Sequence, residues 1–338
     1  MPSVSSRLLL TIVALAFVAS IGVLSAFAWR VAHEPLLDGA SPAVVRVSAG
    51  MSARGIANQL PQAGIRVDPR VFVLASWATG TSRALRAGRY EVDPGMNLLG
   101  LLARLRKGEV LRERLTLPEG VTLREMRAVL DAAQELRHDT AGITEGALLK
   151  AVGATEPSGE GIFAPDTYLY DPGTSDIEVL RMAYRAQQAR IRGAWERRAP
   201  ALPYKSPYDA LIMASLIEKE TGRAEERRRI AGVFVNRERL GMLLQTDPSV
   251  IFGLGDRYDG RLHARDLTTD TPYNTYTRAG LPPTPIASPS RASIDAALDP
   301  EPTRALYFVA RGDGTSEFSE TLLQHNRAVA TFQRGASR

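Results

Sequence analysis

The longest apolar segment of the chain lies at its beginning. Residues 8–29 read LLLTIVALAFVASIGVLSAFAW and contain no charged side chain. A helix of about 20 such residues crosses the roughly 30 Å hydrocarbon core of a bilayer. The alternative is a cleaved secretion signal ending near Ala28, but the apolar part of a signal is only about 7–15 residues long. We therefore predict a retained transmembrane helix over residues 8–29. Because few residues precede it, we expect residues 1–7 to be cytoplasmic and the rest of the chain to lie outside.

After a predicted linker at residues 30–43, one pattern occurs three times. Each copy has the end of an apolar strand, a glycine, a polar residue that can cap a helix, and then apolar residues three and four apart. The three glycines are Gly50, Gly95 and Gly120, and the three capping residues are Ser52, Asn97 and Thr122. This pattern predicts short strands at residues 44–47, 89–92 and 111–117, each followed by a turn with positive φ at the glycine and by a helix.

The remainder of the chain has the longer apolar period of helices. We predict helices at residues 176–199, 208–220, 224–240, 291–298 and 322–332, and a strand at 306–310 before a hairpin turn at 312–314. Residues 241–289 are rich in Gly, Pro, Thr and Tyr, and we expect them to form an irregular functional surface. The predicted fold class is α+β: a transmembrane helix, an α+β module at 44–115, and a mainly helical domain with a few strands at 116–338.

Composition narrows the chemistry. Of the 338 residues, 44% are hydrophobic and 23% charged, as in ordinary globular proteins. The net charge of +5 favours anionic surroundings, but no zinc-ligand cluster, basic tail or aromatic RNA-binding signature points to nucleic acid. The chain has no cysteine, which excludes disulfides, thiolate metal sites and cysteine nucleophiles. We expect no metal and no other cofactor.

The strongest candidate for chemistry is a glutamate at the end of the predicted helix 208–220. This helix is apolar until its last turn, where Glu218 and Glu220 occur. Positions i and i+2 point to different sides of a helix, so the two do not form a facing acid pair. Glu220 lies one turn from Leu216 and Ile217, and a carboxyl set against apolar groups has a raised pKa, as a proton donor at neutral pH requires. The alternative is that both glutamates are solvated charges at a fraying helix end.

Amide, hydroxyl and aromatic side chains gather further along the chain. Such groups suit a sugar polymer, because aromatic rings pack on pyranose faces and amides bind hydroxyl and N-acetyl groups. The alternative is that they build the turns of the loops. The candidate substrate-binding residues are Asn236, Gln245, Asp247, Tyr273, Asn274 and Tyr276.

An ordered set of short motifs carries a family resemblance. It comprises Ile217-Glu-Lys-Glu220-Thr, Phe234-Val-Asn236-Arg237, Leu244-Gln245-Thr-Asp247-Pro, Pro272-Tyr-Asn274-Thr-Tyr276, Gly280-Leu-Pro-Pro283 and Ile286-Ala-Ser-Pro289. Together these motifs resemble the endolytic murein transglycosylase family (MltG, YceG-like) over nearly the whole chain. The resemblance implies cleavage of the MurNAc–GlcNAc bond inside nascent peptidoglycan strands, with a 1,6-anhydroMurNAc end that terminates elongation.

The resemblance also implies roles and a location. Glu220 matches the catalytic glutamate, and Gln245, Tyr273, Asn274 and Tyr276 match substrate-grasping motifs of lytic transglycosylases. The expected location is the bacterial inner membrane, as a single-pass protein with its catalytic domain in the periplasm. Peptidoglycan is the expected partner, with peptidoglycan synthases as candidate protein partners and no nucleic acid.

The sequence is also compatible with three further interpretations. The first two repeat copies resemble LysM modules, which bind N-acetylglucosamine polymers, although a plain α+β spacer would show the same pattern. The chain could also be a non-catalytic membrane-anchored scaffold that binds the wall, or a hydrolytic muramidase. Hydrolysis requires a second carboxylate near Glu220, and the candidates are Asp166, Glu226 and Asp247.

Overall fold

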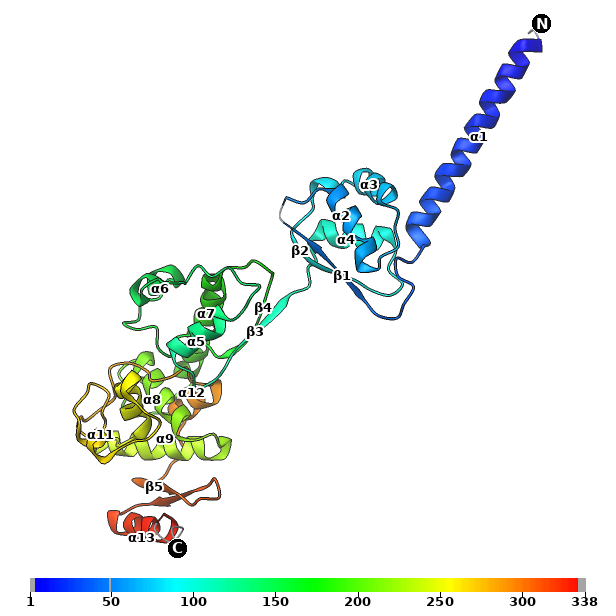
Figure 1. Ribbon diagram of the computed structural model, residues 1–338. Coiled ribbons are helices and arrows are strands. Elements are labelled where there is room, and N and C mark those ends of the chain that lie inside the picture. Colours follow the sequence, from blue (N-terminus) through cyan, green and yellow to red (C-terminus); the bar gives the residue numbers. More distant parts are fainter. Residues whose placement is uncertain (1–3, 49, 334–338) are drawn as a thin grey trace. The chain divides into compact units, whose positions relative to one another are not determined.

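The chain folds into two units, and the first helix belongs to the first of them. The computed structural model describes residues 4–48 and 50–333, and contacts divide the chain into a first unit, Met1–Glu113, and a second unit, Arg114–Arg338. Helix α1 (Val4–His33) contains the stretch Thr11–His33, which is long and apolar enough to cross a membrane (Figure 1). It continues past Trp29, the predicted end of the transmembrane helix, because the residues that follow pack into the first unit.

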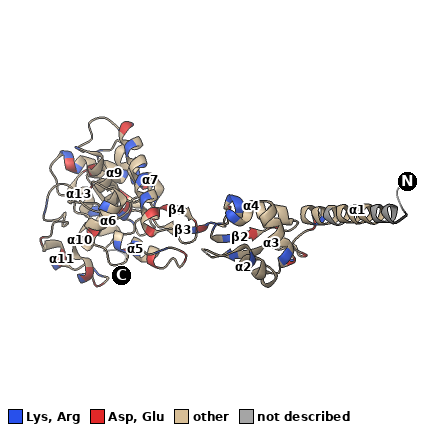
Figure 2. Ribbon diagram, turned by 90° about the horizontal axis from the view of Figure 1, so that it is seen from above, with Lys and Arg blue, Asp and Glu red and all other residues tan. Residues whose placement is uncertain are grey.

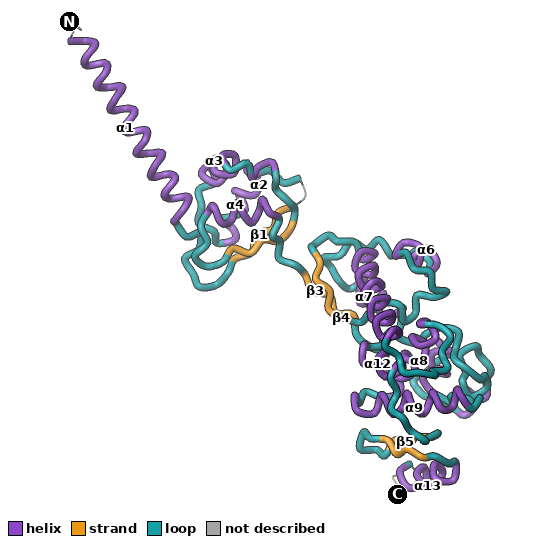
Figure 3. Tube along the Cα trace, turned by 180° about the vertical axis from the view of Figure 1, so that it is seen from behind, coloured by secondary structure: helices purple, strands orange, loops and turns teal. Residues whose placement is uncertain are grey.

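The first unit is a two-stranded sheet covered by helices. Strand β1 (Ala43–Val47) pairs antiparallel with β2 (Gly88–Val92), and Val45 lies opposite Tyr90. Helices α2 (Ala53–Gln59) and α3 (Pro69–Ala78) lie between these strands in sequence, and α4 (Leu98–Lys107) follows them (Figure 3). Buried side chains of all five elements form one core. Helix α3 has no counterpart among the predicted helices, because its apolar residues are consecutive, Val71 to Leu74, and show no helical spacing.

The predicted turns of the repeat are confirmed. Gly50, Gly95 and Gly120 have φ values of +76°, +82° and +70°, in the left-handed region that favours glycine. The side chains of Ser52, Asn97 and Thr122 each accept a hydrogen bond from the backbone N–H three residues later. At Thr122 the cap is reciprocal, because Glu125 accepts from the Thr122 backbone. Local sequence therefore decides how each of these three helices starts.

The second unit is built mainly from helices. Strand β3 (Glu113–Leu117) pairs with β4 (Asp166–Tyr170), and helices α5 (Leu123–Asp131) and α6 (Glu145–Val152) lie between them in sequence. Helix α8 (Pro207–Glu220) contacts α7 (Asp176–Glu196), α9 (Ala224–Arg239) and α12 (Arg291–Leu298) (Figure 1). All eight residues from Ala210 to Ile217 are buried, which makes α8 the central helix of this core.

The carboxyl-terminal part is a hairpin with a helix. Strands β5 (Tyr307–Ala310) and β6 (Ser316–Ser319) pair antiparallel, and α13 (Leu322–Phe332) packs on them. These elements and helices α7, α8, α9 and α12 agree with the prediction to within a few residues. The prediction for 241–289 was incomplete, because this stretch holds two short helices, α10 (Asp247–Leu254) and α11 (Ala264–Thr268). A proline at the start of α10 and a glycine within it hid its apolar period.

Candidate functional site

The two glutamates at the end of α8 have different surroundings. Glu218 Oε2 accepts hydrogen bonds from the Ser290 N–H at 3.0 Å, the Ser290 hydroxyl at 2.5 Å and the Ser293 hydroxyl at 2.6 Å. Ser290 caps α12, so Glu218 holds the first turn of that helix against α8. Its carboxylate is occupied by packing contacts within the fold.

Glu220 is partly buried on the other side of the helix end. Burial raises the pKa of its carboxyl to about 7, and the nearby negative charge of Asp247 acts in the same direction. The Thr246 hydroxyl donates a hydrogen bond to Glu220 Oε1, which lowers the pKa, as does the positive charge of Arg237. The predicted rise in the pKa of Glu220 is confirmed in direction, and it brings this carboxyl within reach of a proton at neutral pH.

Thr246 is held by a buried network of hydroxyl groups. The Thr246 N–H donates to Thr275 Oγ1 at 3.0 Å, and the Ser249 hydroxyl donates to the Thr246 carbonyl at 2.8 Å. Next to it, the Gln245 N–H donates to the Thr275 carbonyl at 3.1 Å. These bonds join the segment before α10 to the loop at 272–276, and they fix the hydroxyl that contacts Glu220.

Gln245 has a strained backbone and an exposed side chain. Its φ of +51° lies in the left-handed region, which residues other than glycine rarely adopt. Such strain persists only where the surrounding bonds enforce it, and it is concentrated at functional sites. Here the residue as a whole is exposed, and its Oε1 accepts from Nη1 of the buried Arg237 at 3.5 Å, beside Glu220's partner Thr246.

Asp247 and Tyr276 form the next part of the site. The Tyr276 hydroxyl donates to Asp247 Oδ1 at 2.5 Å, and burial followed by the Asp247 charge raises the pKa of this phenol. Asp247 itself is exposed. Of the predicted residues, the structure therefore brings Gln245, Asp247 and Tyr276 to the neighbourhood of Glu220.

Arg237 was not among the predicted site residues, although it belongs to one of the quoted motifs. Its buried guanidinium donates from Nε to the Leu306 carbonyl at 2.6 Å and from Nη1 to the Leu244 carbonyl at 2.8 Å. It also lies over the Tyr307 ring, 5.1 Å from the centroid, and that ring stacks on His325. Arg237 thus ties α9, β5 and the segment before Gln245 together. Tyr307 lies in the predicted strand 306–310, but no site role was predicted for it.

The side chains of Asn236 and Asn274, two predicted substrate-binding residues, contact the backbone. Asn236 Nδ2 donates to the Thr303 carbonyl at 2.8 Å and the Ala305 carbonyl at 3.2 Å. Asn274 is fully buried; its Nδ2 donates to three carbonyls of the 266–269 turn, and its Oδ1 accepts from the Tyr276 N–H at 2.9 Å. The amide nitrogens of both residues are engaged with the backbone, so both side chains help to shape these segments. Residue type alone cannot show which way an amide points.

Tyr273 lies in a different place from Tyr276. Its ring meets Phe252 edge-on with centroids 4.8 Å apart, and its hydroxyl bonds with Thr284 Oγ1 at 3.0 Å. Both rings line a cavity of about 650 Å³, whose walls also include Arg124, Arg127, Glu145 and Glu160. Tyr273 and Tyr276 are close in sequence, yet they serve different surfaces of the same loop.

Glu160 in this cavity is a second acid with a raised pKa. Only 7% of the residue is exposed, and burial raises the pKa of its carboxyl to about 7. Both carboxylate oxygens accept from the Leu123 N–H, each at 3.0 Å, at the start of α5. The sequence around it, Ser-Gly-Glu-Gly, carries no period or motif that could have marked it.

The three candidates for a second catalytic carboxylate lie in different surroundings. Asp166 forms an ion pair with Arg190 at 2.5 Å, and Glu226 accepts from the Ser316 N–H at 2.7 Å and hydroxyl at 2.8 Å. Only Asp247 lies beside Glu220. Within residues 4–48 and 50–333, no group of three His, Cys, Asp or Glu side chains is arranged to hold a metal ion.

In this α+β fold, the surface around Glu220 indicates a protein that works by acid–base chemistry. A carboxyl whose pKa is raised to about 7, held by one hydroxyl and lying near the exposed residues Gln245 and Asp247, can act as a general acid and base on a polar substrate. The chain belongs to the YceG-like family, whose profile matches residues 45–331. The predicted family is thereby confirmed.

Similar proteins support this assignment. The chain is 29% identical over 323 residues to an endolytic murein transglycosylase of Bacillus subtilis (strain 168), covering 87% of this chain and 86% of that protein. It is 27% identical to an endolytic murein transglycosylase of Streptococcus pneumoniae (strain D39), of which the match covers 57%. Among solved structures, a putative yceG-like protein from Listeria monocytogenes is 28% identical with a TM-score of 0.54, covering 85% of this chain and 98% of that one.

Proposed function

We propose that this chain is an endolytic peptidoglycan lytic transglycosylase, with Glu220 as its single catalytic acid and base. The enzyme cuts the MurNAc–GlcNAc bond within a glycan strand, leaves a 1,6-anhydroMurNAc end and so terminates strand elongation. Two relatives in its family carry the name endolytic murein transglycosylase. The observation that carries the assignment is the Glu220 carboxyl, partly buried, held by Thr246 and with a pKa raised to about 7.

The reaction uses the same carboxyl twice. Protonated Glu220 donates its proton to the oxygen that links MurNAc C1 to GlcNAc, and the C1–O bond breaks as that oxygen leaves as a hydroxyl. Positive charge develops at C1, where the substrate's 2-acetamido group can stabilise it. The Glu220 carboxylate then takes the proton of the C6 hydroxyl on the same MurNAc. O6 bonds to C1, the anhydro ring closes and the acid form is restored. Because the nucleophile belongs to the substrate, proximity supplies much of the rate.

Neighbouring residues set the two protonation states. The Thr246 hydroxyl stabilises the carboxylate after the first proton transfer, whereas the Asp247 charge favours return of the proton. Gln245 and Tyr276 offer an amide and a phenol on the same surface for hydroxyl and N-acetyl groups. Tyr273 extends the surface towards the cavity at Glu160. Asn236 and Asn274 position these loops through hydrogen bonds to the backbone.

Product analysis tests the proposal directly. Purified glycan strands are incubated with the full chain, and the products are separated and weighed by mass spectrometry. We expect fragments with anhydro ends from the wild type. We expect none above background from Glu220→Gln, which should still bind strands. Glu218→Gln is the matched control, because that residue contacts Ser290 and Ser293 on the other side of α8, and it should keep substantial activity.

Hydrolysis is the second candidate, and one observation favours it: Asp247 is an exposed carboxylate beside Glu220. Retaining and inverting glycosidases need a second carboxyl at about 5–9.5 Å. Fragments with reducing ends, lost in Asp247→Asn, would establish hydrolysis and overturn the transglycosylase proposal. A chain that binds strands but releases no fragment of either kind would be a scaffold.

We propose a LysM-like, glycan-binding role for the module at 44–115, next to a catalytic domain at 116–338. The order β1–α2–α3–β2 with antiparallel pairing supports this proposal, since it places two helices between two paired strands. Deletion of residues 44–105 should weaken binding to peptidoglycan sacculi more than it alters the bond cleaved. Unchanged sacculus binding would leave a spacer role.

We propose that α1 anchors the chain in the bacterial inner membrane, with residues 1–7 inside and the catalytic domain in the periplasm. The stretch Thr11–His33 has the length and composition of a membrane span. Full-length protein should stay in the membrane fraction through a carbonate wash. Release by the wash, or processing after Ala28, would contradict the anchor. Because the proposed substrate is newly made glycan, the peptidoglycan synthases are the candidate partners.

A further inference from the structure

The outer face of α3 combines apolar and basic side chains. Phe72 and Ala75 are buried in the core of the first unit. On the opposite side Leu74 is 53% exposed and Trp77 72% exposed, and Arg70 is also exposed. Positions 70, 74 and 77 are four and three residues apart, so their side chains form one stripe along the helix. An outer stripe of tryptophan, leucine and arginine is typical of helices that lie on a lipid surface.

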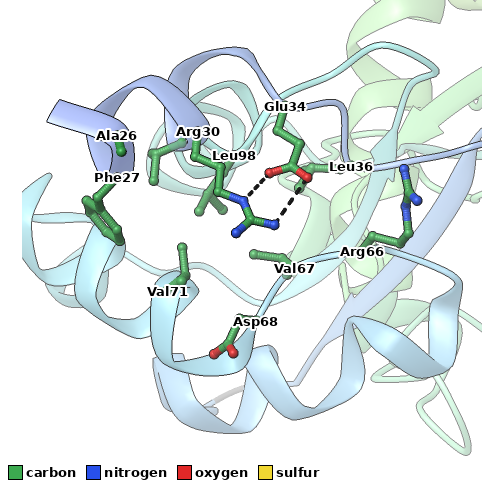
Figure 4. A pocket seen from close by; sticks show the side chains of 11 residues that line it. Ala26, Phe27, Arg30, Glu34, Leu36, Arg66, Val67, Asp68, Val71 and Leu98 are labelled. Carbon is green, nitrogen blue, oxygen red and sulfur yellow. Dashed lines mark hydrogen bonds and ion pairs between the residues drawn. The ribbon is translucent and has the colours of Figure 1, made fainter. Parts of the chain in front are cut away.

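The start of α3, where this stripe begins, lies near the last turns of α1. A cavity of about 630 Å³ separates the last turns of α1 from the start of α3. Figure 4 shows Phe27 and Arg30 of α1 on one side of this cavity, and Asp68 and Val71 at the start of α3 on the other. Asp68 caps α3 by accepting from the Arg70 N–H at 2.7 Å. The two helices are therefore neighbours within the first unit.

The end of α1 is joined to the first unit by packing and hydrogen bonds. Val31 is 7% exposed and belongs to the core that includes Phe72. Asn97 Nδ2 donates to the Ala32 carbonyl at 2.5 Å, and the Leu36 N–H donates to the Met96 carbonyl at 2.8 Å. A membrane spanned by α1 must consequently end close to the residues around this junction, α3 among them.

The charge of the first unit fits an anionic surface. Residues 8–113 contain 12 Lys and Arg against 7 Asp and Glu, a net charge of +5, whereas residues 114–338 contain 29 against 30. Basic residues gather, for example, in the last turn of α4, blue in Figure 2. Each basic side chain close to an anionic bilayer adds to the attraction.

We propose that the Arg70–Leu74–Trp77 face of α3 rests on the outer lipid surface of the membrane that α1 crosses. This inference rests on the membrane anchor proposed above. The Trp77 ring lies at the headgroup boundary, Leu74 enters the apolar layer beneath it, and the Arg70 guanidinium meets lipid phosphates. Two attachments, one helix through the bilayer and one along it, then fix the orientation of the first unit on the membrane.

The three tryptophans of the chain provide the test, because they lie in three different places. Trp29 is on α1, Trp77 on α3 and Trp195 on α7 of the second unit. Full-length variants that keep one tryptophan, with the other two replaced by phenylalanine, are reconstituted in phosphatidylcholine–phosphatidylglycerol vesicles. Lipids brominated on the acyl chain quench tryptophan fluorescence only on contact. We expect quenching of Trp77 and Trp29, and none of Trp195.

Each outcome separates the inference from the anchor. Quenching of Trp29 without Trp77 would keep the anchor and refute the α3 contact. If neither is quenched, the anchor fails and the α3 contact falls with it. Quenching of Trp195 to the same extent as Trp77 would show non-specific adsorption and also refute the proposal.

A second variant tests the face itself. In the chain with Trp77 alone, Leu74→Glu should lower the population of lipid-bound α3 by about tenfold, because burying one leucine side chain contributes at least that factor. Leu240→Glu is the matched control: Leu240 is 63% exposed but lies at the end of α9 in the second unit. Equal quenching in both variants would contradict a role for the α3 face.

Discussion

The second unit contains two regions in which burial raises the pKa of a glutamate to about 7, at Glu160 and at Glu220. At Glu160 both carboxylate oxygens accept from the backbone N–H of Leu123 and the residue is almost fully buried. At Glu220 one oxygen is held by the Thr246 hydroxyl, and exposed side chains of Gln245 and Asp247 lie nearby.

The difference shows that a shifted pKa does not by itself identify a catalytic acid. Desolvation is the largest cause of the raised pKa at both glutamates, so their pKa values are similar. The contacts of the oxygens differ: both Glu160 oxygens accept from the Leu123 N–H at the start of α5, whereas the Thr246 hydroxyl contacts Oε1 of Glu220. We therefore expect similar effects on stability and very different effects on activity when each is neutralised.

The largest effect should come from Glu220→Gln. The substitution keeps the size of the side chain but removes both proton transfers, each worth roughly 10²–10⁴-fold in rate. Glycan cleavage followed by mass spectrometry should fall to background, while binding to sacculi is retained. Anhydro-ended fragments formed at wild-type rates by this variant would refute the assignment.

The wild-type rate should fall steeply above neutral pH. Glu220 must begin the reaction protonated, and its pKa is raised to about 7. Above that pH the protonated fraction drops about tenfold for each pH unit, and kcat/KM should drop with it. Glu160→Gln should leave this profile unchanged, since its carboxyl is bonded to α5. A rate that stays flat from about pH 6 to about pH 9 would argue against protonated Glu220 as the proton donor.

Substitutions next to the acid should move the descending limb in opposite directions. Thr246→Val removes a hydrogen bond that stabilises the carboxylate, so the limb should move to higher pH, by about one unit if the bond contributes roughly 1.4 kcal/mol. Asp247→Asn removes a negative charge that favours the acid form, so the limb should move to lower pH. Both are checked by kcat/KM profiles. Loss of all activity in Asp247→Asn would instead indicate a second catalytic carboxyl.

The smallest effect on activity, but a clear one on stability, is expected from Glu160→Gln. A carboxyl whose folded pKa is raised from 4.5 to about 7 stabilises the fold below pH 4.5 and loses up to about 3 kcal/mol as pH rises through 7. The neutral variant should therefore show a flatter dependence of unfolding free energy on pH across this window. Chemical denaturation at a series of pH values from about 4 to about 8 measures this unfolding free energy across both pKa values. An unchanged slope would mean that Glu160 does not titrate in this window.

The features that could be predicted from the sequence are those that depend on residues close together along the chain. Apolar residues 8–29 predict a helix long enough to span a membrane, and Gly50, Gly95 and Gly120 predict the turns that the structure contains. The apolar run before Glu220 predicts both the buried helix and the direction of the pKa shift. Each of these follows from local backbone preference or from the period of one helix.

The contacts of the polar side chains, by contrast, depend on how distant segments pack together. Glu218 and Glu220 are nearly equivalent in sequence, and they differ because their partners, Ser290 and Thr246, lie 72 and 26 residues away along the chain. Asn274 has the composition of a sugar-binding residue, but three carbonyls of its own loop occupy its amide. A hydrogen bond needs a partner within about 3 Å, and which distant segment supplies that partner is settled by packing of the whole core rather than by local pattern.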